Sequence, residues 1–397
     1  MNSLKDVFIQ NLHTINLENK KCIVRVDFNV PLSDQNKILD NTRIRAVKKT
    51  IDFLISKKAI VILISHMGRP KGKKDQNLSL GKIIDSIESI LKYKIHLIDV
   101  NANNELIHNS ITNIKSNQII MFENIRFNPE EEAYSDQFSK YLSSFGDIYI
   151  NEAFAVSHRN HSSITGIPKF IPSFMGYMMY KEYISISDQN LQLGDNSICI
   201  FGGAKISDKI QILNNFIGKV TYIVIGGGMI KEFANYLNST KTHSEKNNIV
   251  HNILNNDKTK ILIPEDVVIE NQKQEYIIKN LHKVLAEDNI VDIGPETIDL
   301  YSNSIKSSSY ILWNGPMGIF ENPDSKEGTS AIAKAIAENN NAYSVAGGGS
   351  TVQAINQFIS IKDLSHVSTG GGAFMEYIQN GTLPGINAII QNRDSYE

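Results

Sequence analysis

Arginine is scarce in this chain, and its placement is the first indication of chemistry. Of the 40 basic residues only seven are arginine, and six of these seven precede residue 160. They are Arg25, Arg43, Arg45, Arg69, Arg126, Arg159 and Arg393. A guanidinium binds phosphate or carboxylate through two parallel hydrogen bonds, whereas an ammonium offers a point charge. A single arginine is more often a surface or ion-pair residue, but the group favours a pocket for a small polyanion.

Glycine clusters give a second indication, in the other half of the chain. They are "FGGAKISDK" at 201–209, "IGGGMI" at 225–230, "AGGGST" at 346–351 and "TGGGAF" at 369–374. Consecutive glycines between a strand and a helix expose backbone N–H groups that suit phosphate. Lys205 and Lys209 have a spacing that would place both on one helix face, toward the same phosphates. None of the clusters fits a P-loop or a full GxGxxG, and any one could be a tight turn, but together they favour a nucleotide.

The elements that position these residues read as strands alternating with helices. Short apolar runs such as "AIVILISH" and "TYIVIGGG" alternate with amphipathic segments along the whole chain, which is typical of βαβ units. Strands in the first half end in charged or hydrogen-bonding residues, and strands in the second half end in glycine. Ligands of doubly wound sheets bind beyond the carboxyl ends of the strands. We therefore predict an α/β fold with two Rossmann-like, doubly wound parallel-sheet domains joined by a hinge helix.

Prolines mark the domain boundary. Pro168 and Pro172 in "IPKFIPS" interrupt regular structure, and a helical-looking stretch follows them. We predict a first domain at 1–172, a hinge helix at 173–193 and a second domain at 194–385. The segment 386–397 is expected to pack back on the first domain.

Composition excludes several classes of function. The chain has 397 residues, 41% of them apolar, and a net charge of −2, so no basic field suggests nucleic acid. The N-terminus has no signal pattern and no apolar run is long enough to span a membrane, so we expect a cytoplasmic protein without membrane partners. Cys22 and Cys199 have no CxxC spacing, which disfavours a disulfide framework or a zinc site. No oligomerisation motif is visible, and we expect a monomer.

Many segments resemble the signature segments of the phosphoglycerate kinase family. They run in the family's order from residue 24 to 386 and are "VRVDFNVPL", "NTRIRA", "SHMGRPKG", "ENIRF", "HRNHSS", "GGAKISDKI", "GGGM", "DIGPETI", "WNGPMGIFE", "VAGGGST" and "VSTGGGAFMEYI". The resemblance implies reversible phosphoryl transfer from 1,3-bisphosphoglycerate to ADP, giving 3-phosphoglycerate and ATP in glycolysis. It also implies Mg²⁺, carried as Mg-ADP or Mg-ATP.

The resemblance assigns roles on the substrate side. Asp27 and Asn29 would hold the glycerate hydroxyl, and Arg43 would lie at the reacting end. His66, Arg69, Arg126 and Arg159 would hold the far phosphate. The complete substrate-binding set is Asp27, Phe28, Asn29, Arg43, His66, Met67, Gly68, Arg69, Arg126 and Arg159. His158 and His161, beside Arg159, are interpreted as scaffold.

Roles on the nucleotide side follow in the same way. Glu321 would bind the ribose, and Lys205 and Lys209 would reach the transferring group. The nucleotide-binding set is Gly203, Ala204, Lys205, Lys209, Gly227, Asn314, Glu321, Gly348, Gly349, Ser350 and Thr351. Arg43, Lys205 and Gly371 are the implied catalytic residues. No general base is needed, because the acceptor carboxylate is already ionised at pH 7.

Departures from the family pattern keep a second hypothesis open. The family's "GGGDT" is "GGGST" here, so Ser350 replaces the aspartate that binds the nucleotide's magnesium, and no carboxylate stands at the usual metal position. The family's "NDAFG" is "NEAFA", which places Glu152 and Ala155 in the chain. The alternative is a non-catalytic protein of the same fold that binds nucleotide or phosphoglycerate. An NAD-dependent dehydrogenase would need GxGxxG and a following acidic residue, and that pair is not found.

Overall fold

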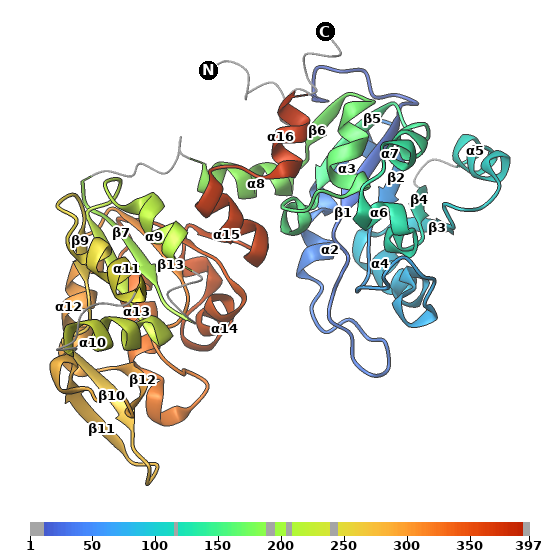
Figure 1. Ribbon diagram of the computed structural model, residues 1–397. Helices are drawn as coiled ribbons and strands as arrows, with labels where there is room; N and C mark the ends of the chain where they lie inside the picture. Colours follow the sequence, from blue (N-terminus) through green and yellow to red (C-terminus); the bar gives the residue numbers. More distant parts are fainter. Residues whose placement is uncertain (1–11, 115–117, 188–194, 204–208, 239–244, 392–397) are drawn as a thin grey trace. The chain divides into compact units, whose positions relative to one another are not determined.

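The computed structural model divides the chain into two compact units (Figure 1). The first contains Met1–Ile184 and Thr382–Glu397, and the second contains Ser185–Gly381. The structure describes residues 12–114, 118–187, 195–203, 209–238 and 245–391. Each unit contains a six-stranded parallel sheet, which confirms the predicted fold class. None of the helices in these ranges is long and apolar enough to cross a membrane. The domain boundaries inferred from the prolines stay predictions.

The first unit is built on strands that are all parallel. They are β1 (Lys21–Val26), β2 (Ile60–Ile64), β3 (Lys94–Ile98), β4 (Gln118–Phe122), β5 (Ile148–Glu152) and β6 (Ser173–Met175). Their order in the sheet is β3-β4-β2-β1-β5-β6. The helices are α2 (Thr42–Ala46), α3 (Lys48–Ser56), α4 (Ile84–Leu91), α5 (Asn104–Thr112), α6 (Pro129–Ala133), α7 (Asp136–Ser143), α8 (Tyr177–Ile186) and α16 (Pro384–Gln391).

Successive side chains of the central strands enter two different hydrophobic cores. Val24 of β1 packs in a cluster that contains side chains of α3 and α4, whereas Ile23 packs in a cluster with α5 and α7. Strands that are buried on both faces have sequences rich in β-branched and other apolar residues, as in "KCIVRV" and "IVILI". The two cores therefore fix which way each strand faces, and they hold its carboxyl end in place.

The second unit repeats this plan with its own sheet. Its parallel strands are β7 (Ser197–Phe201), β8 (Tyr222–Ile225), β9 (Lys260–Leu262), β13 (Tyr310–Asn314), β14 (Tyr343–Ala346) and β15 (His366–Val367). Their order is β15-β14-β13-β7-β8-β9. The helices are α9 (Ile210–Phe216), α10 (Ile230–Asn238), α11 (Glu245–Leu254), α12 (Pro295–Lys306), α13 (Glu327–Glu338), α14 (Gly349–Phe358) and α15 (Gly371–Asn380).

A small antiparallel sheet in the second unit was not predicted. It consists of β10 (Asp266–Glu270), β11 (Tyr276–Asn280) and β12 (Asn289–Ile293), in the order β11-β10-β12. The turn between β10 and β11 contains no glycine. Asn271 closes it by accepting hydrogen bonds from the backbone N–H groups of Lys273 and Glu275, and Gln274 adopts a positive φ of 62°. An Asx turn of this kind gives a weaker hairpin pattern in sequence than Asn-Gly.

The helix predicted at 173–193 is shorter in the structure. Residues Ser173–Met175 form β6, which pairs with β5, and α8 covers only Tyr177–Ile186. Residues 188–194 lie outside the described part of the chain.

Buried side chains of β5 and α3 cap the N-terminus of α8. Tyr177 donates its backbone N–H to Thr50 Oγ1 at 3.0 Å, and Met179 donates to Glu152 Oε2 at 2.9 Å. Glu152 also accepts the hydroxyl hydrogen bond of Thr50. The first N–H groups of a helix have no partner within the helix, so these contacts determine where α8 begins.

The helix α16, from the end of the chain, belongs to the first unit. Figure 1 shows it in red beside β6, with which it is in contact. The backbone N–H of Gly385 donates to Ser157 O at 2.8 Å, and Ile386 and Ile389 are buried. Residues 392–397 of the predicted C-terminal segment lie outside the described residues.

Candidate functional site

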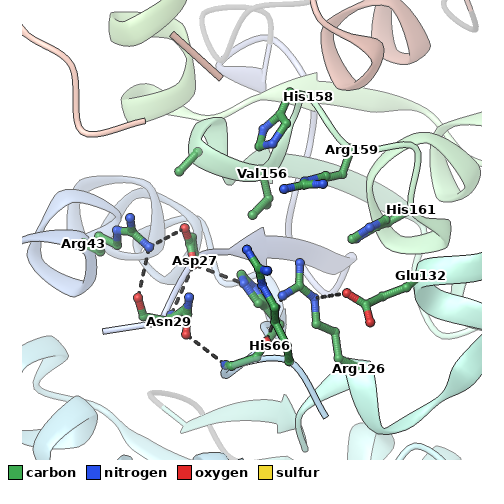
Figure 2. A pocket seen from close by; sticks show the side chains of 13 residues that line it. Asp27, Asn29, Arg43, His66, Arg126, Glu132, Val156, His158, Arg159 and His161 are labelled. Atoms are coloured by element: carbon green, nitrogen blue, oxygen red, sulfur yellow. Dashed lines mark hydrogen bonds and ion pairs between the residues drawn. The ribbon is translucent and has the colours of Figure 1, made fainter. Parts of the chain in front are cut away.

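The first unit contains a polar pocket at the carboxyl ends of β1, β2 and β5 and just beyond β4 (Figure 2). Its volume is about 430 Å³. The lining residues are Asp27, Asn29, Arg43, His66, Gly68, Arg69, Arg126, Glu132, Ala155, Val156, His158, Arg159 and His161. Because β4, β2, β1 and β5 are neighbours in the sheet, residues far apart in the sequence converge here. Four arginines in one hollow make it a site for an anion.

Two predicted residues at the entrance are already paired. Arg43 donates to Asp27 Oδ2 at 2.9 Å and to the backbone oxygen of Asn29 at 3.0 Å. Asn29 Oδ1 accepts from the backbone N–H of Gly68 at 2.9 Å, which joins the loops after β1 and β2. Asp27 is almost completely buried, whereas the Arg43 side chain is 35% exposed.

A buried chain of hydrogen bonds joins Arg25, a neighbour of the lining residue His66, to Glu131. Arg25, fully buried on β1, donates from Nε to Ser163 Oγ at 2.8 Å. Ser163 in turn donates from Oγ to Glu131 Oε1 at 2.6 Å. Burial raises the pKa of Glu131, and the positive charge of Arg25 opposes that rise. Glu131 could not be matched to Arg25 from sequence.

Three buried nitrogen atoms in the pocket have no hydrogen-bond partner within the described residues. They are Arg126 Nε, His158 Nδ1 and His161 Nδ1, and the other such atom found in the same ranges is Tyr310 Oη. Buried polar groups almost always form hydrogen bonds, so a cluster that lacks them indicates a ligand that accepts or donates these bonds. His158 and His161 were interpreted as scaffold from sequence. The structure instead places both in the pocket lining.

Burial, together with the neighbouring arginines, lowers the pKa of the histidines in the pocket. Burial first, and then Arg126, lowers the pKa of His161 to about 3. Burial, and then Arg25, lowers the pKa of His66 well below its ordinary value. Neutral imidazoles can donate a hydrogen bond to a ligand without adding charge. The positive charge of the pocket therefore comes from its guanidinium groups.

Two predicted binding residues do not line this pocket with their side chains. Phe28 is fully buried and Met67 is 4% exposed, and both belong to the core beside α3 and α4. Phe28 donates its backbone N–H to Ser65 Oγ, and the Met67 oxygen accepts from Asn124. Their side chains pack in the core below the loops, and their assignment as substrate-binding residues stays a prediction. By contrast, Arg69 and Arg159 are exposed members of the lining.

The first two glycine clusters of the second unit mainly serve close backbone packing. The N–H groups of Gly202 and Gly203 donate to the oxygens of Asn314 and Pro316, and that of Gly227 donates to Met317 O at 2.8 Å. A Cβ on Gly227 would lie 2.4 Å from Gly203 N. These N–H groups are therefore not available to phosphate, which corrects the sequence interpretation for these clusters.

A second pocket lies beside these packed loops. It has a volume of about 270 Å³. Its lining consists of Gly203, Gly227, Gly228, Ile290, Val291, Asp292, Met317, Gly318, Ile319 and Glu321. A mainly apolar hollow with two carboxyl side chains, Asp292 and Glu321, suits a nucleoside, whose base is apolar and whose ribose carries hydroxyl groups. Gly203, Gly227 and Glu321 are thus brought together as lining.

The last two glycine clusters bring two helix N-termini together. The N-cap residues are Gly348 for α14 and Gly370 for α15, and neither end has a side-chain cap. A Cβ on Gly371 would lie 3.6 Å from Gly349 N, so the two ends are adjacent. A Cβ on Gly349 would meet nothing within 4 Å. Two uncapped ends facing open space provide N–H donors and positive helix dipoles for an anion.

Asn314 connects Lys209 to this anion site. Its Nδ2 donates to Gly347 O at 2.6 Å, and its Oδ1 accepts from Lys209 Nζ. Asn314 is 4% exposed, so it acts here as a support for its neighbours. Lys209 is the N-cap residue of α9 and precedes the helix, so the argument that placed Lys205 and Lys209 on one helix face does not hold. Ala204 and Lys205 lie outside the described residues.

The residues at the start of α14 differ in what they can hold. Thr351 is buried and accepts the backbone N–H of Gly315 at 2.8 Å, whereas Ser350 is exposed. Across the described ranges, no group of three or more His, Cys, Asp or Glu residues could hold a metal ion. Serine offers a neutral oxygen, which can hold a metal-bound water but adds no charge.

Two Rossmann-like units, one with an arginine pocket and one with paired helix N-termini, define a two-domain kinase of the α/β class. The family model described as phosphoglycerate kinase matches residues 12–381. A phosphoglycerate kinase of Dictyoglomus turgidum is 40% identical over 397 residues, which cover 97% of this chain and 99% of that protein. One from Wolbachia pipientis is 37% identical, covering 97% and 100%. The chain belongs to the phosphoglycerate kinase family.

Solved structures agree with this assignment. The phosphoglycerate kinase of Coxiella burnetii matches with a TM-score of 0.84 and 29% identity, over 96% of this chain and 98% of that one. The enzyme of Pyrococcus horikoshii matches with a TM-score of 0.78 and 26% identity, over 97% and 99%. These comparisons support the kinase prediction and not a dehydrogenase.

Proposed function

We propose that the protein is an active phosphoglycerate kinase, which transfers a phosphoryl group from 1,3-bisphosphoglycerate to ADP and yields 3-phosphoglycerate and ATP. The observation that carries this proposal is the arginine pocket with three buried nitrogens that lack a hydrogen-bond partner among the described residues, in a chain of this family. A phosphorylated three-carbon acid matches both the charge and the size of a hollow of about 430 Å³.

The substrate would be held at both ends in this pocket. Asp27 and Asn29 would receive the hydroxyl of the glycerate, and Arg43 would face its carboxyl end. The phosphate at the far end would pair with His66, Arg69, Arg126 and Arg159. His158 and His161 would add N–H donors to the same phosphate, because their unpaired nitrogens lie in the lining.

The nucleotide would occupy the second unit. Glu321 would accept hydrogen bonds from the ribose, beside the mainly apolar hollow. The phosphates would lie at the N-termini of α14 and α15, where Gly348, Gly349 and Gly371 leave N–H groups uncapped. Lys209 would reach the transferring group from its position on Asn314. Lys205, outside the described residues, keeps its proposed catalytic role.

The chemistry requires charge and alignment and needs no base. An oxygen of the ADP β-phosphate attacks the phosphorus of the acyl phosphate, a new P–O bond forms, and the bond to the carboxyl oxygen breaks. The leaving carboxylate keeps the electron pair, and no proton moves. Charge builds on three equatorial oxygens, which guanidinium, ammonium and backbone N–H groups stabilise. We propose that the units close on each other when both ligands are bound, which brings donor and acceptor together and excludes water.

Magnesium would arrive with the nucleotide as part of the substrate. When bound, it supplies charge neutralisation at the phosphates. Ser350 would contribute a hydrogen bond to one of its waters, and the nucleotide phosphates would hold the ion. We also propose that the protein works as a monomer in the cytoplasm.

A coupled assay with 1,3-bisphosphoglycerate and Mg-ADP tests this function. ATP should form at a rate that depends on both substrates. If calorimetry showed that both ligands bind but no ATP appeared, the protein would be a binding protein of this fold and the proposal would be wrong.

A further inference from the structure

Glu132 is an acidic residue in the lining of an anion pocket, and the proposed function gives it no role. The lining contains one other carboxylate, that of Asp27, which is paired with Arg43. Glu132 follows Glu131 on α6, but its side chain is 35% exposed, whereas that of Glu131 is fully buried. A carboxylate at the mouth of a phosphate pocket opposes the binding of the phosphate. Its presence therefore calls for a physical reason.

Glu132 is in contact with one of the arginines that would bind the phosphate. Its Oε1 lies 3.2 Å from Arg126 Nε, and Figure 2 marks this contact between the two side chains with a dashed line. This contact is an ion pair without hydrogen-bond geometry, because Arg126 Nε has no hydrogen-bond partner in the described residues. The Nε group is thus neutralised by Glu132 and still able to donate to a ligand.

Arg126 does not depend on Glu132 for its position. Its guanidinium donates from NH1 to Gly68 O at 2.8 Å, and its backbone N–H donates to Asn124 Oδ1 at 3.2 Å. The Arg126 side chain is 8% exposed and is held by these contacts from below. The Glu132 side chain is much more exposed and can turn into solvent at little cost.

We propose that Glu132 is a specificity-determining residue that competes with the incoming phosphate for Arg126. This inference rests on the proposed function of the pocket. The carboxylate occupies Arg126 until a ligand displaces it. A ligand that also engages Arg69, Arg159 and Asp27 gains enough contacts to displace Glu132, whereas a small inorganic anion does not. Glu132 thereby keeps common anions from occupying Arg126.

The arrangement accounts for the electrostatics of Arg126. Burial, and then the neighbouring charge of Arg25, lowers the pKa of this guanidinium, and Glu132 is the foremost group that acts in the opposite direction. Glu131 and Asp27 also act in that direction. Glu132 is the one of these three that is exposed enough to leave when a phosphate replaces its charge.

Isothermal titration of the full-length protein with 3-phosphoglycerate and, separately, with sulfate tests the proposal. Glu132→Gln should bind both ligands more tightly, by roughly 3- to 10-fold, since one opposing charge beside a dianion is removed at a partly exposed site. The proportional gain should be larger for sulfate, which lacks the contacts at the other end of the pocket. Glu130→Gln, on the same helix and exposed outside the lining, is the matched control and should change neither affinity by more than about twofold.

The outcomes separate this proposal from the proposed function. Equal affinities for wild type and Glu132→Gln would overturn it, and weaker binding by the variant would show instead that Glu132 positions Arg126. Failure of the wild-type protein to bind 3-phosphoglycerate would contradict the proposed function itself. Circular dichroism and the melting temperature of Glu132→Gln establish that it is folded. Glu132→Ala serves as a second variant, with the same gain expected.

Discussion

Arg43 donates a hydrogen bond of 2.9 Å to Asp27 Oδ2, so the arginine assigned to the reacting end is already tied to the carboxylate assigned to the substrate hydroxyl. The second hydrogen bond of Arg43, to Asn29 O, fixes the same guanidinium nitrogen. A charged group held in advance loses little conformational freedom when charge develops on the substrate. We therefore expect the rate of the reaction to be sensitive to changes at Arg43.

Replacing Arg43 with alanine should lower kcat on the order of 10²-fold or more, because its charge is needed most in the transition state. Arg159→Ala should act mainly by raising KM for phosphoglycerate, since it holds the end that does not react. Steady-state kinetics of both variants checks this difference. Arg45→Ala is the control, since Arg45 binds Asn41 outside the pocket. A kcat for Arg43→Ala within a few-fold of wild type would refute the assignment.

Ser350→Asp should reduce the concentration of free Mg²⁺ needed for activity and lower KM for Mg-ADP. The new carboxylate would add the negative charge that the serine hydroxyl lacks. A magnesium titration of kcat/KM at constant ionic strength measures the effect, and Ser307→Asp, exposed at the end of α12, controls for added charge. Coincident curves for wild type and Ser350→Asp would mean that this position does not face the metal.

Glu152 should make the stability of the first unit depend on pH. Burial raises the pKa of this carboxyl from 4.5 to about 7. The folded protein therefore binds the proton more tightly than the unfolded chain does. Stability is lost as the pH rises from about 4.5 to about 7, by up to about 3 kcal/mol. The amide side chain of Glu152→Gln cannot ionise, so the stability of this variant should not fall with pH in this way. The variant should also be less stable by a constant free energy at every pH, because its amide nitrogen cannot accept a hydrogen bond from the N–H of Met179.

Melting temperatures of wild type and Glu152→Gln between pH 5 and pH 8 provide the measurement. The wild type should have the higher melting temperature at pH 5, and this difference should shrink or reverse by pH 8. Glu130→Gln, a change at an exposed site, should track wild type throughout. Parallel curves for wild type and Glu152→Gln would show that the buried carboxyl does not titrate in this range.

Two glycine substitutions should affect different properties, one the stability of the second unit and the other the binding of ADP. Gly227→Ala would place a methyl group 2.4 Å from Gly203 N at a φ of 61°, and should destabilise the second unit by on the order of 2–4 kcal/mol. Gly349→Ala meets nothing within 4 Å and should fold normally, but its methyl group would occupy the space proposed for nucleotide phosphate. Calorimetric unfolding and ADP titration of each variant test the contrast. Unchanged ADP affinity in Gly349→Ala would place the phosphates elsewhere.

Binding of both substrates should contract the protein, because phosphoryl transfer requires the two ligands to meet in line. Small-angle scattering with 3-phosphoglycerate and a non-hydrolysable ATP analogue should give a smaller radius of gyration than either ligand alone. An unchanged radius would argue against closure.

The parts of the site that follow strand ends could be predicted from sequence. Asp27, His66 and Arg159 come directly after or soon after apolar runs, and parallel strands bring their carboxyl ends together. The partners inside the fold could not be predicted, because pairing depends on packing between distant segments. Glu131 meets Arg25 through Ser163, and nothing in the spacing of these residues indicates it.

The contacts of the glycine clusters could not be predicted from sequence either. Their composition indicates close backbone approach but does not say what is approached. The backbone of Gly227 packs against that of Gly203, whereas a Cβ on Gly349 would meet nothing within 4 Å. Phe28 and Met67 were assigned to the substrate from the resemblance to the family, and their side chains pack in the core.

The contact between Gly385 and Ser157 has a consequence for how the polypeptide is made. The second unit is an insertion within the first, whose polypeptide begins before it and ends after it. A nascent chain emerging from the ribosome can complete the inserted unit while the earlier one still lacks α16. The surface around Ile164 that Gly385 covers stays open until α16 has been synthesised. The first unit therefore begins to be synthesised before the second unit but can complete its fold only after it.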